Sequence, residues 1–590
     1  MGLRICLVTP LALSQPHEVN EHVAGAAAAL RARGHAVTVL APSNRAADLA
    51  AGRRALRRLE LGAEPLDGTI ALGPAIPVAP RQRLSVPVGL RADLRLALAR
   101  GGFDLVHAHE PGLPGISNLA LREAGTITVA TFHDPERLAY PPARSQRTKL
   151  LGRIDALTAT GEPALEAARS RFPGSYRLLP RGVDTATFTP GPARQRFAVE
   201  WDGEARAPAR TAIRALRDLE GYELVVIRTG GRSSRPYVPR ELRERVVVQR
   251  LGTAATRAAA LQGAYGFVAG SDPGSHLALE ALACGVPVIA PAGRLEQPEL
   301  VAAAMARLAE DEGFRRGEAA RARAAAEAHG FDRLAAELES LYRSLLGRRR
   351  PRGPVDPLAD RPWIFADFHM HTEHSHDCSI PVPELLDHAE EIGLGAIAVT
   401  DHNVFSGARE AVELARGRSL VVIPGEEVKT DGQGEVIGLF LSEEIPRGMS
   451  MADTIAAIRD QGGLVYLPHP FDRLHSIPDT ATLHRHLPEL DVLEVYNARL
   501  LFESYNDEAV RFARKYNLLA GAGSDAHVLE GVGTGCVRMR TFETPEEFLL
   551  SLRSAEIVRR PKSLLYLQGK KWLAQARERR ARTAQPARSR

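Results

Sequence analysis

The feature that most constrains the fold is an alternation of short apolar runs with helical patterns that continues through most of the 590 residues. Early in the chain, LRICLVT is followed by a helical stretch and then by HAVTVLAPS, and FDLVHAHE and ITVATFHD repeat this order. Such runs are typical of parallel strands joined by crossover helices. We therefore expect an α/β protein whose ligands bind at the carboxyl ends of its strands.

The chain is too long for one ordinary domain, and its composition changes near residue 347. GRRRPRGPVDPLADRP is rich in arginine and proline and has no apolar periodicity, as is typical of an exposed linker. Beyond it, residues 362–560 hold 11 of the 19 histidines. We expect two α/β domains over 1–170 and 171–346, a linker over 347–361, a third domain over 362–560 and a basic tail over 561–590.

Composition narrows the class of protein. Four cysteines in 590 residues argue against a disulfide scaffold and suit a reducing compartment. The sequence has no apolar run of the roughly 18 residues that a membrane helix needs, and its start does not have the pattern of a secretory signal. We expect a cytoplasmic protein, either free or peripheral at the inner face of the membrane, without a transmembrane segment.

The formal net charge of +5 is concentrated in one segment. Residues 561–590 carry nine lysines and arginines against one acid, Glu578, so the other 560 residues are slightly acidic in sum. A basic tail is most often a solvated end. Its charge also suits an anionic membrane surface or a nucleic acid, and both remain open as partners.

Five stretches of the first 346 residues form a set: RARGHAVTVLAPS, FDLVHAHEPGLPG, VATFHD, YRLLPRGVDTATFTP and LALEALACGVPVIAP. This set resembles the retaining GT-B glycosyltransferases of family 4, in particular the phosphatidylinositol mannosyltransferases. The resemblance implies a pair of Rossmann-like domains and a GDP- or UDP-sugar donor. It also implies that Asp272 and Glu280 bind the donor, since carboxylates accept sugar hydroxyl groups well, and that His133 is a catalytic residue near the transferred sugar.

The same region departs from the family pattern at two places. Family members carry a Gly-Gly loop after the first strand, where this chain has Pro16 and His17. They carry basic residues for the donor diphosphate where this chain has Glu200, Trp201 and Asp202. Acidic groups beside a diphosphate repel it. An active transferase and a non-catalytic module that binds a sugar, nucleotide or lipid head group therefore both remain open.

In the later part of the chain, polar clusters follow six predicted strands: HMHTEHSHD, TDHN, GEE, PHP, EVYN and GSDAH. In a β/α barrel the carboxyl ends of the strands gather on one face. Imidazole and carboxylate without thiolate suit catalytic Zn, Mn or Fe. His369 and His371 are two residues apart on a strand, so they point the same way. The clusters offer more ligands than one ion needs, and we expect two or three divalent metals.

These motifs, in this order, resemble the PHP (polymerase and histidinol phosphatase) superfamily, a distorted (βα)7 barrel. The resemblance implies the metal ligands His369, His371, Asp377, His402, Glu427, His469, Asp525 and His527, with Glu427 bridging two ions. Three further candidates for catalysis are Asp401, which would orient His402 or another ligand, and Arg473 and Arg499, which would meet a phosphate. Glu435 stands where the family often has a histidine.

The whole sequence predicts a bifunctional enzyme: a metal-dependent phosphoesterase, which hydrolyses a phosphorylated small molecule or nucleotide with metal-activated water, fused to a family 4-like glycosyltransferase. Three alternatives remain. The PHP domain removes phosphate from the product of the transferase or a related lipid, the GT-B half is only a binding scaffold, or the chain is a nucleic-acid processing phosphoesterase that uses its basic tail.

Overall fold

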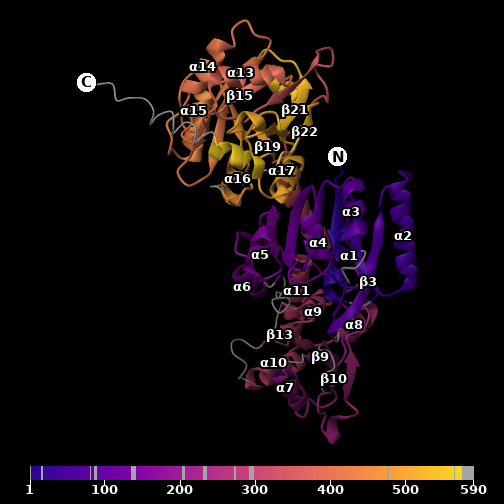
Figure 1. The fold of residues 1–590 in the computed structure, drawn as a ribbon. Coiled ribbons are helices and arrows are strands. Elements are labelled where there is room, and N and C mark those ends of the chain that lie inside the picture. Colours follow the sequence, from indigo (N-terminus) through magenta and orange to yellow (C-terminus); the bar gives the residue numbers. More distant parts are fainter. Residues whose placement is uncertain are drawn as a thin grey trace. The chain divides into compact units, whose positions relative to one another are not determined.

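The computed structural model describes residues 2–14, 17–79, 82–85, 90–133, 141, 143–201, 206–229, 235–270, 274–290, 298–474, 477–563 and 565–573. Pro16, Asp202, Asp272 and the tail beyond residue 573 lie outside these ranges. The chain divides into two compact units, Met1–Leu346 and Gly347–Arg590. Figure 1 shows both units as mixtures of helices and strands. None of the described helices combines the length and apolar character that crossing a bilayer requires.

The first sheet of unit Met1–Leu346 has eight strands in the order β4-β3-β2-β1-β5-β6-β7-β8. All neighbours pair in parallel except β3 and β4. The strands are β1 (Arg4–Val8), β2 (Ala36–Ser43), β3 (Gly68–Ala79), β4 (Gln82–Ser85), β5 (Leu105–His109), β6 (Ile127–Phe132), β7 (Ala156–Ala159) and β8 (Tyr176–Leu178). The helices between them are α1 (Glu18–Ala32), α2 (Ala46–Glu60), α3 (Leu90–Arg100), α4 (Ile116–Glu123), α5 (Arg144–Leu151) and α6 (Glu162–Arg171).

The order of this sheet reverses at β1, which lies between β2 and β5. Parallel α/β sheets bind ligands outside the carboxyl ends of their strands at such a switch point. α1 follows β1 there, and it forms because Val19, Val23, Ala26 and Leu30 recur on one buried face. Gly34 adopts a φ of 85° just after the helix, a conformation that costs glycine little. The switch point therefore lies beside the start of α1.

The second sheet has five strands in the order β11-β10-β9-β12-β13, and all of them are parallel. The strands are β9 (Arg196–Trp201), β10 (Glu223–Arg228), β11 (Val246–Arg250), β12 (Gly266–Val268) and β13 (Val288–Ile289). The helices are α7 (Ala207–Ala215), α8 (Ala254–Leu261), α9 (His276–Ala283), α10 (Pro298–Glu310), α11 (Glu312–Glu327) and α12 (Phe331–Leu346). The two sheets, which are parallel except for the pair β3 and β4, confirm the expected α/β fold of this half.

The last helix, α12, returns to the first sheet and packs against α1. Gly25 allows this approach, because a Cβ atom there would lie 2.2 Å from the ring of Phe331. Gly182 makes room for the same ring, with a Cβ position 2.4 Å away. The hydroxyl group of Tyr342 lies 2.6 Å from Nδ1 of His107 on β5. The first and second sheets are thus joined by a helix as well as by the chain around β8.

Unit Gly347–Arg590 contains a nine-stranded sheet in the order β20-β19-β18-β17-β16-β15-β14-β21-β22. The strands are β14 (Trp363–Asp367), β15 (Ala396–Val399), β16 (Val421–Lys429), β17 (Glu435–Leu439), β18 (Leu464–Leu467), β19 (Val492–Asn497), β20 (Leu519–Gly523), β21 (Gly535–Arg540) and β22 (Glu556–Arg559). The helices are α13 (Val382–Glu391), α14 (Ser406–Leu414), α15 (Met451–Asp460), α16 (Thr480–His486), α17 (Glu503–Tyr516) and α18 (Pro545–Ser551).

This sheet is a nearly closed, distorted barrel. The backbone N–H of Phe368, just after β14, donates to the carbonyl of Ala522 on β20 at 3.3 Å. Met370 forms an isolated parallel bridge with Ala526, so β20 meets the strand that is six places away in the sheet order. β17 is antiparallel to both of its neighbours, and this strand is the main distortion. The expected PHP-like barrel is confirmed as a fold, and its parallel strands direct their carboxyl ends to one face.

Candidate metal centre and sugar-nucleotide site

The predicted metal ligands come together at the carboxyl ends of the barrel strands. His369 and His371 follow β14, His402 follows β15, and Glu427 lies on β16. An isolated parallel bridge joins His402 to Glu427. His469 follows β18, and Asp525 and His527 follow β20. Residues from five strands therefore meet although up to 158 positions separate them in the sequence.

Glu427 is at the centre of the cluster, and 1% of its surface is exposed. Its Oε2 atom lies 2.9 Å from His402 Nδ1 and 3.3 Å from His369 Nε2. Its Oε1 atom lies 3.1 Å from His469 Nε2. Each carboxylate oxygen therefore faces imidazole nitrogen from a different side. A carboxylate with ligands on both oxygens is suited to bridging two ions.

The second half of the cluster is built around Asp525 and Asp377. Asp525 Oδ1 lies 3.4 Å from His371 Nε2 and 3.1 Å from Arg499 Nη1. Asp377 Oδ2 lies 2.8 Å from His527 Nε2, and Asp377 Oδ1 is 3.9 Å from His402 Nε2. All eight residues that the sequence proposes as ligands therefore lie in one connected cluster.

Three overlapping groups in this cluster have ligand atoms within 4.8 Å of one another: His371 with His402 and His527, His369 with His371 and Asp525, and His369 with Glu427 and His469. His371 Nε2 is buried and lies 3.4 Å from Asp525 Oδ1 and 3.6 Å from Glu427 Oε2, but it has no hydrogen bond of good geometry among the described residues. A buried imidazole nitrogen that lacks a hydrogen bond is costly, and a metal ion would relieve this cost. The donor set therefore fits two or three divalent ions.

Charges within the cluster shift its ionisation strongly. Burial alone would lower the pKa of His402 and His469, but the carboxylate of Glu427 raises each to about 9. Burial would raise the pKa of Glu427, but His369 and His402 hold it well below its ordinary value. Without metal, these interactions favour protonated His402 and His469 and a charged Glu427, whereas burial lowers the pKa of His371 and His527. Metal binding must displace those protons.

The three other predicted residues of this site lie in different surroundings. Arg499 reaches the cluster, with Nη1 3.0 Å from His527 Nδ1. Asp401 is buried and accepts hydrogen bonds from the backbone N–H and the hydroxyl group of Thr372, both at 2.7 Å. It therefore holds the loop that follows His371. Arg473 is exposed on the segment after β18.

Glu494 and Lys571 also contact the cluster, although neither was among the predicted ligands. Glu494 on β19 lies 3.1 Å from His369 Nδ1 and accepts the backbone N–H of His469 at 2.8 Å. The sequence could have indicated Glu494 through its position in EVYN, at the end of a predicted strand. Lys571 donates from Nζ to Asp377 Oδ2 at 2.9 Å. It belongs to the basic segment that composition alone assigns to a solvated end.

His133 in the first unit follows β6 and is buried among other histidines. Its Nε2 atom lies 2.9 Å from Nδ1 of His109 on β5, and its ring packs edge-on against His22 of α1 at 4.8 Å between centroids. Nitrogen atoms of all three rings lie within 4.8 Å of one another. Burial lowers the pKa of all three imidazoles. Neutral rings at a strand end can exchange hydrogen bonds with sugar hydroxyl groups.

Glu280, a predicted donor-binding residue, lies on α9 and is fully buried. It accepts three hydrogen bonds from Arg257, at 2.6, 2.8 and 3.0 Å, and its Oε1 atom is 3.1 Å from His276 Nε2. Arg257 also donates to Glu21 of α1 at 2.6 Å. The carboxylate that should meet the donor is therefore part of an ion network that joins α1 to α8 and α9.

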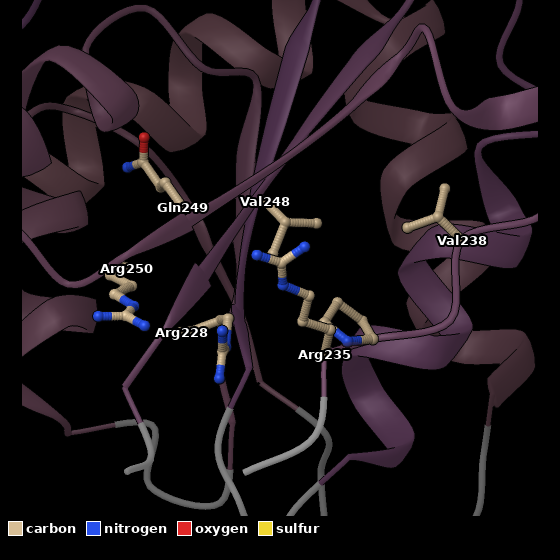
Figure 2. A pocket seen from close by; sticks show the side chains of 7 residues that line it. Arg228, Arg235, Val238, Val248, Gln249 and Arg250 are labelled. Atoms are coloured by element: carbon tan, nitrogen blue, oxygen red, sulfur yellow. The ribbon is translucent and has the colours of Figure 1, made fainter. Parts of the chain in front are cut away.

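A hollow of about 320 Å³ opens at the carboxyl ends of β10 and β11. Three arginines line it, Arg228, Arg235 and Arg250, and Figure 2 shows their guanidinium groups around the hollow. Arg228 pairs with Arg250 in the register of the two strands. None of the described residues that line it is acidic. Clustered guanidinium groups at strand ends are suited to an anion such as a phosphate.

Glu200 and Trp201 end β9, the neighbouring strand. The Oε2 atom of Glu200 faces Ser275, whose hydroxyl group lies at 3.3 Å, and the backbone N–H of Gly270 at 3.4 Å. Glu200 therefore interacts with the loop between β12 and α9. Its hydrogen bonds offset part of the cost of its burial.

Family models match three stretches of the chain. The model described as Glycosyltransferase Family 4 matches residues 19–187. The model described as PHP domain matches residues 367–506, and the model described as PHP-associated matches residues 503–557. The two halves of the sequence that carry the motifs thus match different families.

The chain is also similar in part to individual proteins and to solved structures. An uncharacterized protein of Methanocaldococcus jannaschii is 34% identical over 181 residues, which are 28% of this chain and 71% of that protein. A phosphatidyl-myo-inositol mannosyltransferase of Mycolicibacterium smegmatis is 27% identical over 394 residues, or 58% of this chain and 95% of that protein. A glycosyltransferase structure from Rickettsia africae is 12% identical, with a TM-score of 0.41, and covers 58% of this chain and 99% of its own.

The family matches confirm both resemblances that the motifs indicated. They assign a glycosyltransferase domain to the first unit and a PHP domain to the second, so the chain is an enzyme of two parts. Residues 19–187 of the first unit thus match glycosyltransferase family 4, and residues 367–557 of the second unit match the PHP and PHP-associated models.

Proposed function

We propose that the barrel hydrolyses a phosphate monoester with its bound divalent ions, and that the first unit transfers a sugar from a nucleotide-sugar. The cluster around Glu427 is the observation that supports the first proposal. Imidazoles and carboxylates from five strand ends meet there, and three of the imidazoles face the buried carboxylate of Glu427. When bound, the ions would supply an activated water and charge for the phosphate.

The residues of this chain have distinct tasks in that reaction. His369, His371, His402, Glu427, His469, Asp525, His527 and Asp377 would hold the ions. Glu494 fixes the ring of His369 through its Nδ1 atom. Arg499, beside Asp525 and His527, is placed to bind a phosphate oxygen and to stabilise the charge that develops there.

The first test is the double substitution His369→Ala with His371→Ala. We expect metal-dependent phosphate release to fall to background, because two imidazoles of one cluster are lost. His388→Ala is the matched control, since His388 lies on α13 and pairs only loosely with Glu391 at 3.5 Å. Phosphate release that persists in the double variant, measured over a panel of phosphate esters, would rule out this site.

For the first unit, we propose that the arginine hollow binds the diphosphate of the donor. The family's basic residues are missing from the end of β9, and Arg228 and Arg250 offer positive charge at the ends of the two adjoining strands. Glu280, Asp272 and His133 would contact the sugar and ribose. The relatives named phosphatidyl-myo-inositol mannosyltransferase support a mannosyl donor and a phosphatidylinositol-like lipid acceptor.

Titration of the full chain with GDP- and UDP-sugars tests this second proposal. We expect Arg228→Ala with Arg250→Ala to weaken donor binding by about tenfold or more, since charged hydrogen bonds contribute about 1.5–3 kcal/mol each. Arg217→Ala, which removes an exposed arginine paired with Glu241, should leave it unchanged. Absence of binding by every donor would instead favour a scaffold role for this half.

A further inference from the structure

Residues 565–573, here called the basic helix, form a helical segment in the second unit. The backbone N–H of Leu567 donates to the carbonyl of Ser563 at 3.0 Å, and Ser563 Oγ accepts from the N–H of Tyr566 at 3.5 Å. Serine is a favourable residue at the start of a helix. The helix thus begins at a residue suited to that position, within the most basic part of the sequence.

One side of the basic helix is held against the metal cluster. Lys571 is 13% exposed, and its ammonium group donates to Asp377, which in turn lies 2.8 Å from His527. Lys570 Nζ lies 2.5 Å from Glu530 Oε1, and Lys562 donates to the carbonyl of Glu530 at 2.6 Å. Two lysines of the basic helix, and Lys562 just before it, therefore contact Asp377 and Glu530, the latter in the segment that follows β20.

The other side of the basic helix is apolar and exposed. Leu565 is 86% exposed, Tyr566 48%, Trp572 67% and Leu573 58%. Tyr566, Trp572 and Leu573 follow Leu565 by one, seven and eight positions, so all four lie on one stripe of a helix. Lys571 lies on the opposite side of that helix. Exposed large apolar side chains that form a contiguous stripe indicate an interaction surface.

The chemistry of this stripe suits a lipid surface. Tryptophan and tyrosine are favoured at the boundary between headgroups and acyl chains, and flanking basic residues are attracted to anionic lipids. The sequence from 574 to 590 adds six arginines and one glutamate. Binding to a phosphate backbone depends on basic residues, and stacking on bases would use only Tyr566 and Trp572. Leu565 and Leu573 have no role in either, so the stripe as a whole favours a bilayer over a nucleic acid.

We propose that the basic helix docks the second unit on an anionic bilayer through Leu565, Tyr566, Trp572 and Leu573, and that the barrel acts on a phosphate ester carried by a lipid headgroup. Lys571 is a positioning residue that ties the docked helix to Asp377 at the edge of the cluster. This substrate class rests on the proposed phosphoesterase function, whereas the docking surface does not.

Vesicle sedimentation of the full chain tests the docking surface. We expect the protein to sediment with vesicles of phosphatidylcholine mixed with phosphatidylglycerol, and far less with phosphatidylcholine alone. Trp572→Ala with Leu573→Ala should reduce the bound fraction about tenfold, since binding scales with buried apolar area. Leu61→Ala, which removes an 83% exposed leucine from the other unit, is the matched control and should bind as the unchanged protein does.

Fluorescence gives a second readout, because Trp572 is exposed whereas Trp201 is buried and Trp363 is half-buried. We expect a blue shift of emission on adding anionic vesicles, and no such shift in the double variant. Equal vesicle binding by the double variant would overturn the proposal. So would binding to a DNA duplex in the absence of any vesicle binding.

Hydrolysis assays test the proposed lipid substrate separately from the proposed docking surface. The double variant should hydrolyse soluble p-nitrophenyl phosphate at the rate of the unchanged protein, and a phosphatidylinositol phosphate in anionic vesicles about tenfold more slowly. Equal loss on both substrates would contradict the lipid substrate. Vesicle binding without hydrolysis of any phosphate ester would retain the docking surface and reject the phosphoesterase function.

Discussion

The two ring nitrogens of His369 face carboxylates on opposite sides, Glu427 at 3.3 Å from Nε2 and Glu494 at 3.1 Å from Nδ1. If Nε2 binds an ion, Nδ1 carries the proton and donates it to Glu494. Glu494 therefore selects the tautomer that leaves Nε2 free for the metal, and it increases the basicity of the ring. The sequence shows only that Glu494 lies near the end of a predicted strand, and it does not show that this glutamate contacts His369.

Glu494→Gln should lower metal affinity by about 10- to 100-fold, since a neutral amide is a weaker partner for the imidazole N–H. Equilibrium dialysis with Zn²⁺ or Mn²⁺ measures the change. Glu489→Gln is the control, because Glu489 is half exposed and pairs with His486. Unchanged affinity in Glu494→Gln would show that Glu494 does not orient His369.

His276 gives the first unit a pH dependence. Burial would lower its pKa, but Glu21 and Glu280 raise it from 6.5 to about 9. A folded pKa above the ordinary value means that these ion pairs stabilise the protein fully below about pH 6.5 and are lost as the pH rises through about 9.

We therefore expect the Tm of the first unit to fall as the pH is raised from neutral to above 9. His276→Gln should lower the Tm at neutral pH and flatten this dependence. Scanning calorimetry of the full chain at several pH values measures both effects. A wild-type profile as flat as that of the variant would contradict the assignment.

At the scale of elements, the contact between α1 and α12 depends on a missing side chain. The ring of Phe331 occupies the space where a Cβ atom of Gly25 would lie. This contact fixes the helix that also brings Tyr342 to His107, two positions from His109 of the histidine cluster. The packing of a helix distant in sequence therefore supports the strand end that carries His109.

Gly25→Ala should destabilise the first unit by about 1–3 kcal/mol, as is typical of overpacking. Phe331→Leu should restore much of this loss, because it removes the overlapping ring atoms. Gly317→Ala is the matched helical control, since a Cβ there meets nothing within 4 Å, and it should be neutral or stabilising by up to about 1 kcal/mol. Denaturant unfolding measures all three, and a tolerated Gly25→Ala would contradict the close packing.

Some secondary-structure elements were predicted from the sequence, and others were not. The alternation of strands and helices predicted the parallel sheets, because periodicity is local. It did not predict that β17 runs antiparallel between β16 and β18, since GEVIGLF is equally suited to either direction. The two faces of the basic helix were likewise not predicted from the sequence. Lys571 is partly buried, and Leu565 and Trp572 are exposed, only because one face of the helix contacts the barrel.

At the scale of the whole molecule, the chain has two compact units, and the predicted metal ligands all lie in the second unit. Removal of metal with a chelator should therefore lower the Tm of the second unit and leave that of the first unchanged. Ions at about 100 times their dissociation constant would contribute about 2.7 kcal/mol of stability. Calorimetry with and without chelator, and with His369→Ala and His371→Ala as a chelator-insensitive control, measures this. An equal shift in both units would contradict the location of the metals.

The sequence by itself indicated the two families, the α/β class and eight candidate ligands, because motifs at strand ends can be recognised from their residues and spacing alone. The ligands' roles remain proposals. Only the tertiary structure showed that Glu427 lies between three imidazoles, that Glu494 lies behind His369, that Arg257 and His276 surround Glu280, and that Lys571 reaches Asp377. These facts depend on contacts between residues far apart in the chain, and no local pattern records such contacts.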